Sequence, residues 1–318
     1  MSRMRVALLD DYQGVALRHG DWSRVKDAVV VPFGDHVHDK DELADRLAEF
    51  DAVLRVRERT EFPRSLLARL PRLKLILATG IRNKDSIDLA AARELGITVC
   101  GTDALQRETV EVTWGLIISL FRGLHREISS LRAGGWQLGV GRRLTGKTLG
   151  IVGFGTMGLP VSLVARAFEM KVLAWSPNLT PERTEPHGVE AVSRERLFAE
   201  SDAITIHVPL SDKSRGLVNA ADIGRMKRDA FLVNTSRSAL IDQPALVAAL
   251  RDNRIGGLGV DVYDSEPLAA DHPYRLLSNV LATPHIGYVT KENYEIFYGQ
   301  SVENLEAFLA GSPIRVIN

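Results

Sequence analysis

The segment from Lys147 to Ser176 constrains the fold more than any other part of the chain. It begins with a short apolar run, Leu149–Val152, which is typical of a buried parallel strand. A G-x-G-x-x-G pattern follows, then an apolar stripe at helical spacing and a second apolar run, Val172–Trp175. Strand, glycine turn, helix and strand in this order predict a dinucleotide-binding unit. The stripe consists of Leu159, Leu163, Val164, Ala167 and Phe168.

Each glycine of the pattern has a physical reason. Gly153 allows the tight turn after the strand, Gly155 lets a pyrophosphate approach the backbone, and Gly158 lets helix and strand pack closely. The N-terminus of the helix offers unpaired N–H groups and a partial positive charge to the phosphates. We therefore expect the whole turn, with Thr156 and Met157, to hold a dinucleotide.

Strands and helices alternate on both sides of this unit, which predicts an α/β fold with parallel sheets. The first hundred residues lack a glycine fingerprint, so we interpret them as a separate domain that does not hold the cofactor. Residues 106–133 read as one long helix or as two that are broken near Gly123. A helix over Ser86–Leu95 is expected to be capped by Asp85 or Ser86 and to end at Gly96. Other expected strands are Val6–Leu9, Val29–Val31, Ala52–Val56, Leu73–Ala78, Thr98–Val99, Ala203–Val208, Phe231–Asn234, Gly257–Asp261 and Val280–Ala282, and the closing helix is expected over Lys291–Ala310.

Composition excludes several classes of protein. The 318 residues are 45% hydrophobic and 25% charged, as in a globular protein of two domains. Forty basic residues balance forty acidic ones, which does not favour a nucleic-acid or anionic-membrane partner. We find no signal peptide, no apolar stretch long enough to cross a membrane and no metal-ligand cluster. The single cysteine, Cys100, fits a reducing cytoplasm.

Three polar segments each follow a predicted strand, at the edge where open α/β sheets place ligands. They contain Arg237, Glu266 and His285. Arg237 can hold a carboxylate through two hydrogen bonds and polarise a carbonyl group. His285 can transfer a proton, and Glu266 can orient the imidazole and favour its charged form.

Together with the fingerprint and the sequence His207-Val208-Pro209-Leu210, these segments resemble the D-isomer-specific 2-hydroxyacid dehydrogenase family. The resemblance spans essentially the whole chain. It implies reversible hydride transfer between NAD(P)H and a small 2-oxo acid such as glyoxylate or hydroxypyruvate. It also implies two Rossmann-like domains: a discontinuous substrate domain, residues 1–101 plus 287–318, closed by the C-terminal helix, and a dinucleotide-binding domain, residues 102–286. A homodimer is implied too, with residues 106–133 as its interface.

The resemblance also assigns roles. Arg237 would bind and polarise the 2-oxo acid, Glu266 would tune His285, and His285 would be the acid/base. His207 fits a structural role as well as a cofactor contact. The residues that would contact the cofactor are Gly153, Gly155, Thr156, Met157, Gly158, His207, Pro209, Thr235 and, at the nicotinamide carboxamide, Asp261. The loops that would bind the substrate carboxylate contain Arg57, Gly80, Ile81 and Arg82.

Several positions depart from the family pattern. The second strand of the nucleotide unit is followed by Ser176-Pro177-Asn178, where NAD-specific members carry an acidic residue. NAD and NADP both remain open as cofactor, with a slight preference for NADP, whose 2′-phosphate Ser176, Asn178 or Arg183 could bind. Arg82 could add a positive charge near the substrate. Ser238 replaces a glycine and Tyr288 a small residue, and Tyr288 could line the site.

Two alternative functions remain open. The first is a 3-phosphoglycerate dehydrogenase-like enzyme, although we expect no regulatory extension after Asn318. The second is a non-catalytic, dinucleotide-sensing binding protein, since such proteins of similar fold keep the same Arg, Glu and His set.

Overall fold

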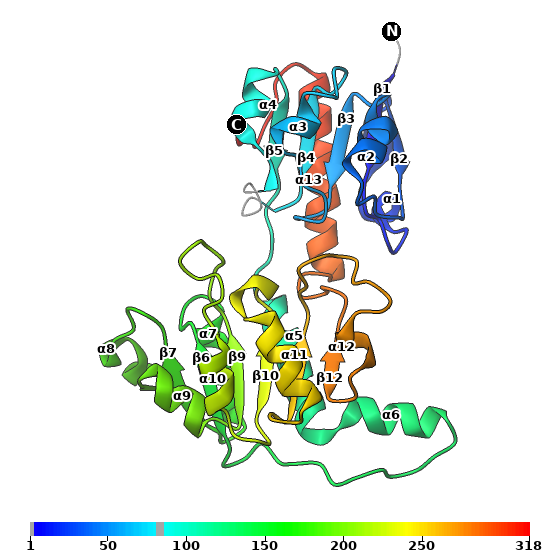
Figure 1. Cartoon of the computed structure of the whole chain (residues 1–318). Helices are drawn as coiled ribbons and strands as arrows, with labels where there is room; N and C mark the ends of the chain where they lie inside the picture. The colour runs from blue at the N-terminus through cyan, green and yellow to red at the C-terminus, as the bar shows by residue number, and fades with distance from the viewer. Residues whose placement is uncertain (1–2, 81–85) are drawn as a thin grey trace. The chain divides into compact units, whose positions relative to one another are not determined.

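The computed structural model describes residues 3–80 and 86–318. The chain divides into two compact units, Met1–Leu105 with Val289–Asn318 and Gln106–Tyr288. The elements of both are labelled in Figure 1. The boundaries at Leu105 and Val289 lie within a few residues of the expected positions, 101 and 287.

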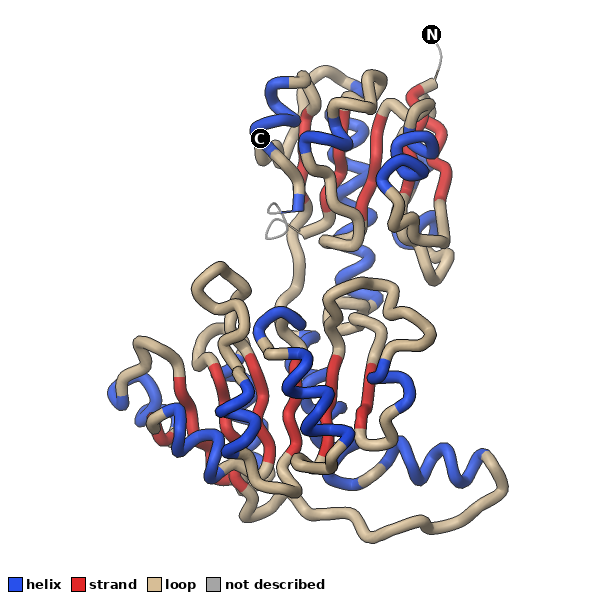
Figure 2. The backbone as a smooth tube through the Cα atoms, in the orientation of Figure 1, coloured by secondary structure: helices blue, strands red, loops and turns tan. Residues whose placement is uncertain are grey.

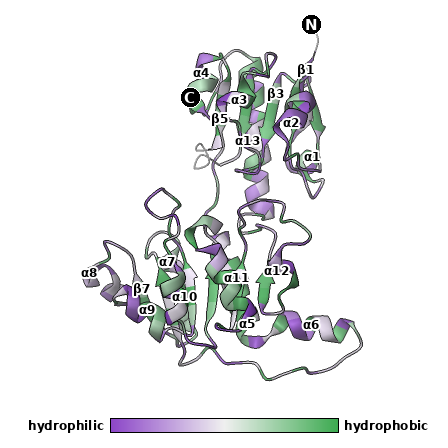
Figure 3. Cartoon of the chain, viewed as in Figure 1, coloured by the Kyte–Doolittle hydropathy of each residue, from purple (hydrophilic) through white to green (hydrophobic). Residues whose placement is uncertain are grey.

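The first unit is built on a five-stranded parallel sheet in the order β2-β1-β3-β4-β5. Strands β3 and β4 lie inside the sheet and are buried along their whole length, which explains the apolar runs Ala52–Leu54 and Leu75–Ala78. Figure 3 shows these strands as predominantly hydrophobic. The strands are β1 (Met4–Leu8), β2 (Ala28–Pro32), β3 (Ala52–Arg55), β4 (Leu75–Ala78) and β5 (Thr98–Gly101). The helices are α1 (Ala16–His19), α2 (Lys40–Leu47), α3 (Arg64–Leu67), α4 (Leu89–Glu94) and α13 (Lys291–Leu309).

The C-terminal helix belongs to this first unit, as the resemblance predicts. Its aromatic residues Tyr294, Phe297 and Tyr298 are buried, so they form core. The chain after α13 runs along strand β5: the amide of Gly101 donates to the carbonyl of Arg315 at 2.9 Å. The last residues therefore extend the edge of the sheet.

Helix α4 begins later than predicted. Its N-cap is Asp88, whose carboxylate accepts a hydrogen bond from the amide of Ala91 at 2.8 Å. The predicted cap Ser86 does not start the helix, because Ile87 pairs with Phe62 in a short parallel bridge. Asp85, the other predicted cap, lies outside the described residues.

The second unit contains a seven-stranded parallel sheet in the order β12-β11-β10-β9-β6-β7-β8. The strand order reverses between β6 and β9, and such a switch point is where open α/β sheets bind ligands. Figure 2 shows helices packed against the strands of this sheet. The strands are β6 (Thr148–Val152), β7 (Lys171–Trp175), β8 (Glu190–Ala191), β9 (Ala203–Ile206), β10 (Phe231–Asn234), β11 (Gly257–Val260) and β12 (Val280–Ala282). The helices are α5 (Glu108–Arg122), α6 (Leu124–Arg132), α7 (Gly158–Ala167), α8 (Pro181–Thr184), α9 (Arg194–Glu200), α10 (Ala220–Arg225), α11 (Gln243–Arg251) and α12 (Pro273–Leu276).

Residues 106–133 form two helices, α5 and α6, separated at Gly123, which is the second of the two alternatives that the sequence left open. Gly123 adopts a left-handed conformation, with φ of 65°, that ends α5. Helix α5 packs into the core, whereas α6 has no buried residue. Helix α6 and the loop that follows it extend away from the sheet of this unit (Figures 1 and 2).

Helix α7 buries only part of its apolar stripe. Leu163 is 49% exposed and Phe168 is 37% exposed, whereas Leu159 and Val164 are partly buried against the core. The fully buried face carries Val161 and Ala165, at helical spacing from Gly158. Gly158 determines this orientation, because a Cβ atom there would lie 2.1 Å from the carbonyl oxygen of Gly153.

Candidate active site

The glycine turn joins β6 to α7 at the switch point of the second sheet. Gly153 has φ of 97°, and a Cβ atom there would lie 2.5 Å from the carbonyl oxygen of His207. The turn therefore packs against the loop after β9 so closely that only glycine fits. Gly155 has no atom within 4 Å of its Cβ position, which leaves its backbone open to a ligand.

A cavity of about 600 Å³ lies beside this turn. The turn contributes Gly155 and Thr156 to its wall, and two arginines, Arg107 and Arg183, line it as well. Neither guanidinium forms a hydrogen bond or ion pair with another described residue. Open backbone, a helix N-terminus and two arginines fit the phosphates of a dinucleotide. Arg183 was a sequence candidate; Arg107, at the N-cap of α5, had no distinguishing sequence signal.

Other expected cofactor residues lie at the carboxyl ends of the strands near the switch point. Ser176 and Asn178 follow β7, where Ser176 is half-buried and Asn178 is exposed. His207 and Pro209 follow β9, and the Ser236 hydroxyl ties this loop to β10 by donating to the carbonyl of Val208 at 2.7 Å.

His207 and Thr235 already have partners inside the protein. The Nε2 atom of His207 lies 2.9 Å from the Thr205 hydroxyl oxygen, and burial lowers the pKa of the imidazole to about 4. The ring is therefore neutral at physiological pH, which agrees with a positioning role for it. The Thr235 hydroxyl lies 2.8 Å from that of Thr113, so Thr235 also ties β10 to α5.

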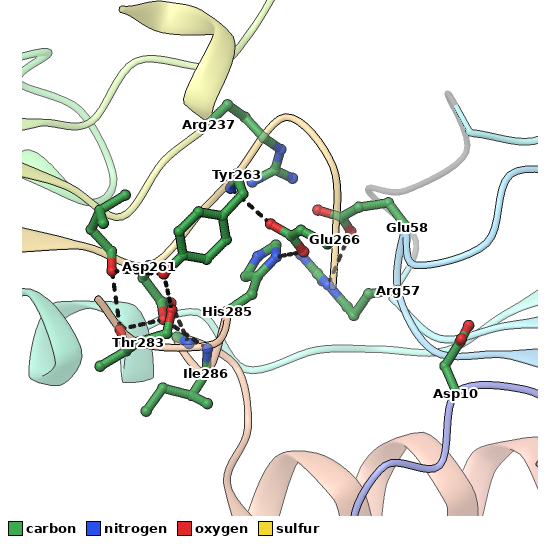
Figure 4. A network of polar contacts seen from close by, with 12 residues as sticks. Asp10, Arg57, Glu58, Arg237, Asp261, Tyr263, Glu266, Thr283, His285 and Ile286 are labelled. Atoms are coloured by element: carbon green, nitrogen blue, oxygen red, sulfur yellow. Dashed lines mark hydrogen bonds and ion pairs between the residues drawn. The ribbon is translucent and has the colours of Figure 1, made fainter. Parts of the chain in front are cut away.

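Arg237, Glu266 and His285 follow β10, β11 and β12, three neighbouring strands of one parallel sheet. Parallel strands end at the same edge, so these residues come from one edge of the second unit. Figure 4 shows their side chains. Glu266 bridges the set: its Oε2 atom lies 2.6 Å from Nδ1 of His285, and its Oε1 atom accepts the amide hydrogen of Tyr263 at 2.9 Å.

The loop that carries Arg237 is shaped by Asn234. The Asn234 side chain donates to the carbonyl of Arg237 at 2.8 Å and accepts from the amide of Ser236 at 3.0 Å. Arg237 itself is extended and half-buried, and it donates to the carbonyl of Ser236 at 2.7 Å. Ser238 begins a short 3₁₀ turn without a left-handed backbone, so a serine replaces the family's glycine there without strain.

His285 lies in an unusual backbone conformation, with φ of 52°. Tyr288 packs its ring edge-on against the imidazole, with 5.4 Å between ring centroids, and is 7% exposed. Asp261 accepts three hydrogen bonds from the loop that carries His285. Burial raises the pKa of Asp261, while the Thr283 hydroxyl and the Ile286 amide act in the opposite direction.

The candidate substrate residues lie in the first unit, at the carboxyl ends of β3 and β4. Arg57 has φ of 53°, and its amide donates to the Thr79 hydroxyl at 2.8 Å. The amide of Gly80 donates to the Thr102 hydroxyl at 2.9 Å. Ile81 and Arg82 lie outside the described residues.

Sequence reasoning missed a buried polar cluster in the first unit. The His36 ring is buried, and its Nδ1 atom lies 2.8 Å from the carboxylate of Asp10, which also accepts from the Thr60 hydroxyl at 2.7 Å. No sequence signal relates these residues, because they come from loops after three different strands. Within residues 3–80 and 86–318, no group of His, Cys, Asp and Glu is arranged to hold a metal ion, and no helix is long and apolar enough to span a membrane.

This chain is similar to known proteins both over its second unit and over most of its length. The sequence profile of the D-isomer-specific 2-hydroxyacid dehydrogenase NAD-binding domain matches residues 114–287. A glyoxylate reductase from Aeropyrum pernix is 36% identical over 266 residues, which are 80% of this chain and 78% of the relative. A hydroxypyruvate reductase from Thermotoga maritima is 39% identical over 259 residues, which are 80% of this chain and 83% of the relative.

A solved structure extends the likeness to the complete chain. The crystal structure of a phosphoglycerate oxidoreductase from Vibrio cholerae superposes with a TM-score of 0.91 at 36% identity, covering 97% of this chain and 100% of the other. The chain spans about half the length of the D-3-phosphoglycerate dehydrogenases that it also matches.

Proposed function

The chain belongs to the D-isomer-specific 2-hydroxyacid dehydrogenase family, whose members are NAD(P)-dependent oxidoreductases acting on the CH–OH group of 2-hydroxy acids, and we propose that it reduces a small 2-oxo acid such as glyoxylate or hydroxypyruvate. The names of the two relatives support this substrate class. The single observation that carries the proposal is the 2.6 Å contact between Glu266 and His285 at the sheet edge that also bears Arg237.

The contact with Glu266 determines which imidazole nitrogen is available. Since Nδ1 faces the carboxylate, it keeps its hydrogen, and Nε2 is the atom that donates a proton to the carbonyl oxygen. Arg237 is proposed to bind the 2-oxo acid and to stabilise the negative charge that develops on this oxygen. When bound, the nicotinamide supplies the hydride that reaches the carbonyl carbon. The residues of this chain thus supply the proton and the charge stabilisation.

We propose that Arg57, Gly80, Ile81 and Arg82 bind the carboxylate of the substrate. The left-handed conformation of Arg57 supports this role, since strained backbone clusters at functional sites. Replacing Arg57 or Arg82 by alanine should raise the KM for the 2-oxo acid at least about tenfold, the value of one good ionic hydrogen bond. A variant with an unchanged KM for every substrate would show that the replaced arginine does not bind the substrate carboxylate.

We propose the turn from Gly153 to Gly158, together with His207, Pro209 and Thr235, as the cofactor site, with a slight preference for NADP. The absence of an acidic residue at Ser176 and Asn178, and the two arginines in the cavity, support a 2′-phosphate. Arg183→Ala should therefore raise the KM for NADPH more than that for NADH. Equal effects on both cofactors would mean that Arg183 contacts the shared diphosphate instead.

The proposal is tested by initial rates of NADH and NADPH oxidation with glyoxylate, hydroxypyruvate, pyruvate and 3-phosphohydroxypyruvate. Turnover of glyoxylate or hydroxypyruvate, lost by more than about 100-fold in His285→Ala and Arg237→Ala, is the expected result. Selective turnover of 3-phosphohydroxypyruvate would favour the second candidate, a 3-phosphoglycerate dehydrogenase, which the Vibrio structure supports. Cofactor binding without any turnover would favour a dinucleotide sensor.

We also propose a cytoplasmic homodimer. Helix α6 exposes Leu124, Ile128 and Leu131, and the loop after it exposes Trp136, Leu138 and Val140, a set of apolar side chains that a second copy would cover. Light scattering should give twice the mass of 35.0 kDa for the native chain and a monomer for Ile128→Asp with Leu131→Asp. A native monomer would contradict this assignment. The buried free thiol of Cys100 supports the reducing compartment, which cell fractionation tests.

A further inference from the structure

The carboxylate of Asp261 is directed at the loop that carries His285. Its Oδ1 atom accepts from the Thr283 hydroxyl at 2.6 Å and from the amide of Ile286 at 2.9 Å. Its Oδ2 atom accepts from the amide of Gly287 at 2.8 Å. Figure 4 shows the bonds from Thr283 and Ile286, the residues on either side of the segment that carries His285, to Asp261. Asp261 is only 1% exposed, so these bonds form out of contact with water.

His285 lies between the donors of these bonds. Its φ of 52° is in the left-handed region, which residues other than glycine rarely adopt, so the surrounding structure must hold it there. The amide of His285 donates back to the carbonyl of Thr283 at 2.9 Å, which closes a tight turn. Asp261 therefore binds the chain on both sides of the strained residue, before it at Thr283 and after it at Ile286 and Gly287.

The far side of Gly287 is held as well. The Thr109 hydroxyl donates to the carbonyl of Gly287 at 3.0 Å. A Cβ atom on Gly287 would lie 3.1 Å from Oδ2 of Asp261 and 3.2 Å from the Thr109 hydroxyl oxygen. A carboxylate offers about four acceptor positions, and three of those on Asp261 are used by this one loop.

We propose that Asp261 is a positioning residue for His285: its carboxylate holds the backbone in the conformation that presents the imidazole to Glu266. The proposal rests on the proposed function of His285 as the proton donor. It differs from the carboxamide role that the resemblance implies, because Asp261 then acts on proton transfer rather than on cofactor affinity. The two roles predict opposite splits between kcat and the affinity for NAD(P)H.

Asp261→Asn separates the roles with little change in volume. The NH₂ group of the new amide replaces one of the two carboxylate oxygens. In one orientation it faces the Thr283 hydroxyl and the Ile286 amide, and in the other it faces the Gly287 amide, so a donor always meets a donor. We expect the loop to shift and kcat to fall about 100-fold, the effect of misplacing a catalytic group by about 1 Å. The Kd for NAD(P)H, measured by fluorescence titration, should change less than threefold. A large rise in Kd with unchanged kcat at saturating cofactor would overturn the proposal.

A second readout does not depend on turnover. The proton between His285 Nδ1 and Glu266 should give a strongly downfield NMR resonance in the cofactor-free protein, and Glu266→Gln, which removes it, assigns the signal. The signal should be lost or broadened in Asp261→Asn and unchanged in Asp264→Asn, an exposed carboxylate in the neighbouring loop. An intact signal in Asp261→Asn would overturn the positioning role. Failure of the proposed function would instead appear as absent turnover in a native chain that shows the signal.

Thr283→Val and Thr283→Ser keep the proposal testable if Asp261→Asn does not fold. Valine removes one of the three donors to Asp261 with little change in shape, whereas serine retains the hydroxyl. We expect a roughly tenfold loss of kcat with valine, corresponding to one hydrogen bond to a charged group, and recovery with serine. Equal activity of both variants would contradict the role of these bonds.

Discussion

The Glu266→Gln substitution tests the assignment of His285 as the proton donor, because it replaces one carboxylate oxygen of Glu266 by an NH₂ group. The amide oxygen can still accept from the amide of Tyr263, and its NH₂ group then faces Nδ1 of His285. An NH₂ group cannot accept a hydrogen bond, so it disfavours the imidazolium, which carries hydrogen on both nitrogens. The variant therefore favours the neutral ring, which cannot donate a proton while keeping its orientation.

The size of the effect follows from the contact that is lost. A hydrogen bond to a charged group contributes about 1.5–3 kcal/mol, which corresponds to a fall of about 10- to 150-fold in the rate of reduction at neutral pH. The side chains of His285 and Glu266 are 17% and 25% exposed, so solvent screening favours the lower half of this range.

Steady-state kcat for glyoxylate reduction at neutral pH measures this effect, with Asp264→Asn as a control of equal charge. A native kcat in Glu266→Gln, or an equal fall of kcat in Asp264→Asn, would contradict the role of the Glu266 contact.

Three further predictions concern the cofactor site and stability. Gly153→Ala should destabilise the protein by about 1–3 kcal/mol and abolish NAD(P)H binding, because its Cβ would lie 2.5 Å from the His207 carbonyl oxygen. Gly155→Ala, where the Cβ position is open, should lose NAD(P)H binding but keep the thermal unfolding midpoint of the native protein. Equal midpoints for the two variants would contradict this difference. Burial lowers the pKa of His207 to about 4 from 6.5, so between these pH values the His207 imidazole binds a proton in the unfolded chain but not in the folded one. The free energy of unfolding should therefore fall by up to about 3 kcal/mol from pH 6.5 to pH 4. In His207→Gln this part of the pH dependence should vanish from urea unfolding curves, and its persistence would show that another group causes it. Burial raises the pKa of Cys100 to about 11, so its thiol should react with Ellman's reagent only on unfolding, and rapid reaction of the native chain would contradict its burial.

Periodic patterns predicted the fold well where burial alone determines an element. Strands Phe231–Asn234 and Val280–Ala282 have the predicted bounds, and the glycine turn has the predicted strand and helix on either side. The short apolar runs of central strands are buried on both faces, so they carry a strong signal. The polar residues that follow these strands were predictable for the same reason, because parallel strands end at one edge.

The errors come from contacts between distant segments. Apolar residues on α7 do not by themselves indicate its buried face, because the close approach of Gly158 to the turn determines how the helix packs. Helix α4 starts late, since Ile87 pairs with Phe62, a residue far away in the sequence. The bonds from Asp261 to the His285 loop could not be predicted from the sequence either, because two of the three come from backbone amides, which almost every residue type offers.

Transfer of deuterium from labelled cofactor to product shows whether this chain delivers hydride to a 2-oxo acid. The protein would be incubated with glyoxylate and reduced cofactor that carries deuterium on one or the other face of nicotinamide C4, and the glycolate would be analysed by mass spectrometry. We expect one deuterium on C2 of glycolate from only one of the two labelled cofactors, in the native chain and not in His285→Ala. Glycolate without deuterium from either cofactor, or no glycolate from a chain that binds both, would contradict hydride transfer to a 2-oxo acid.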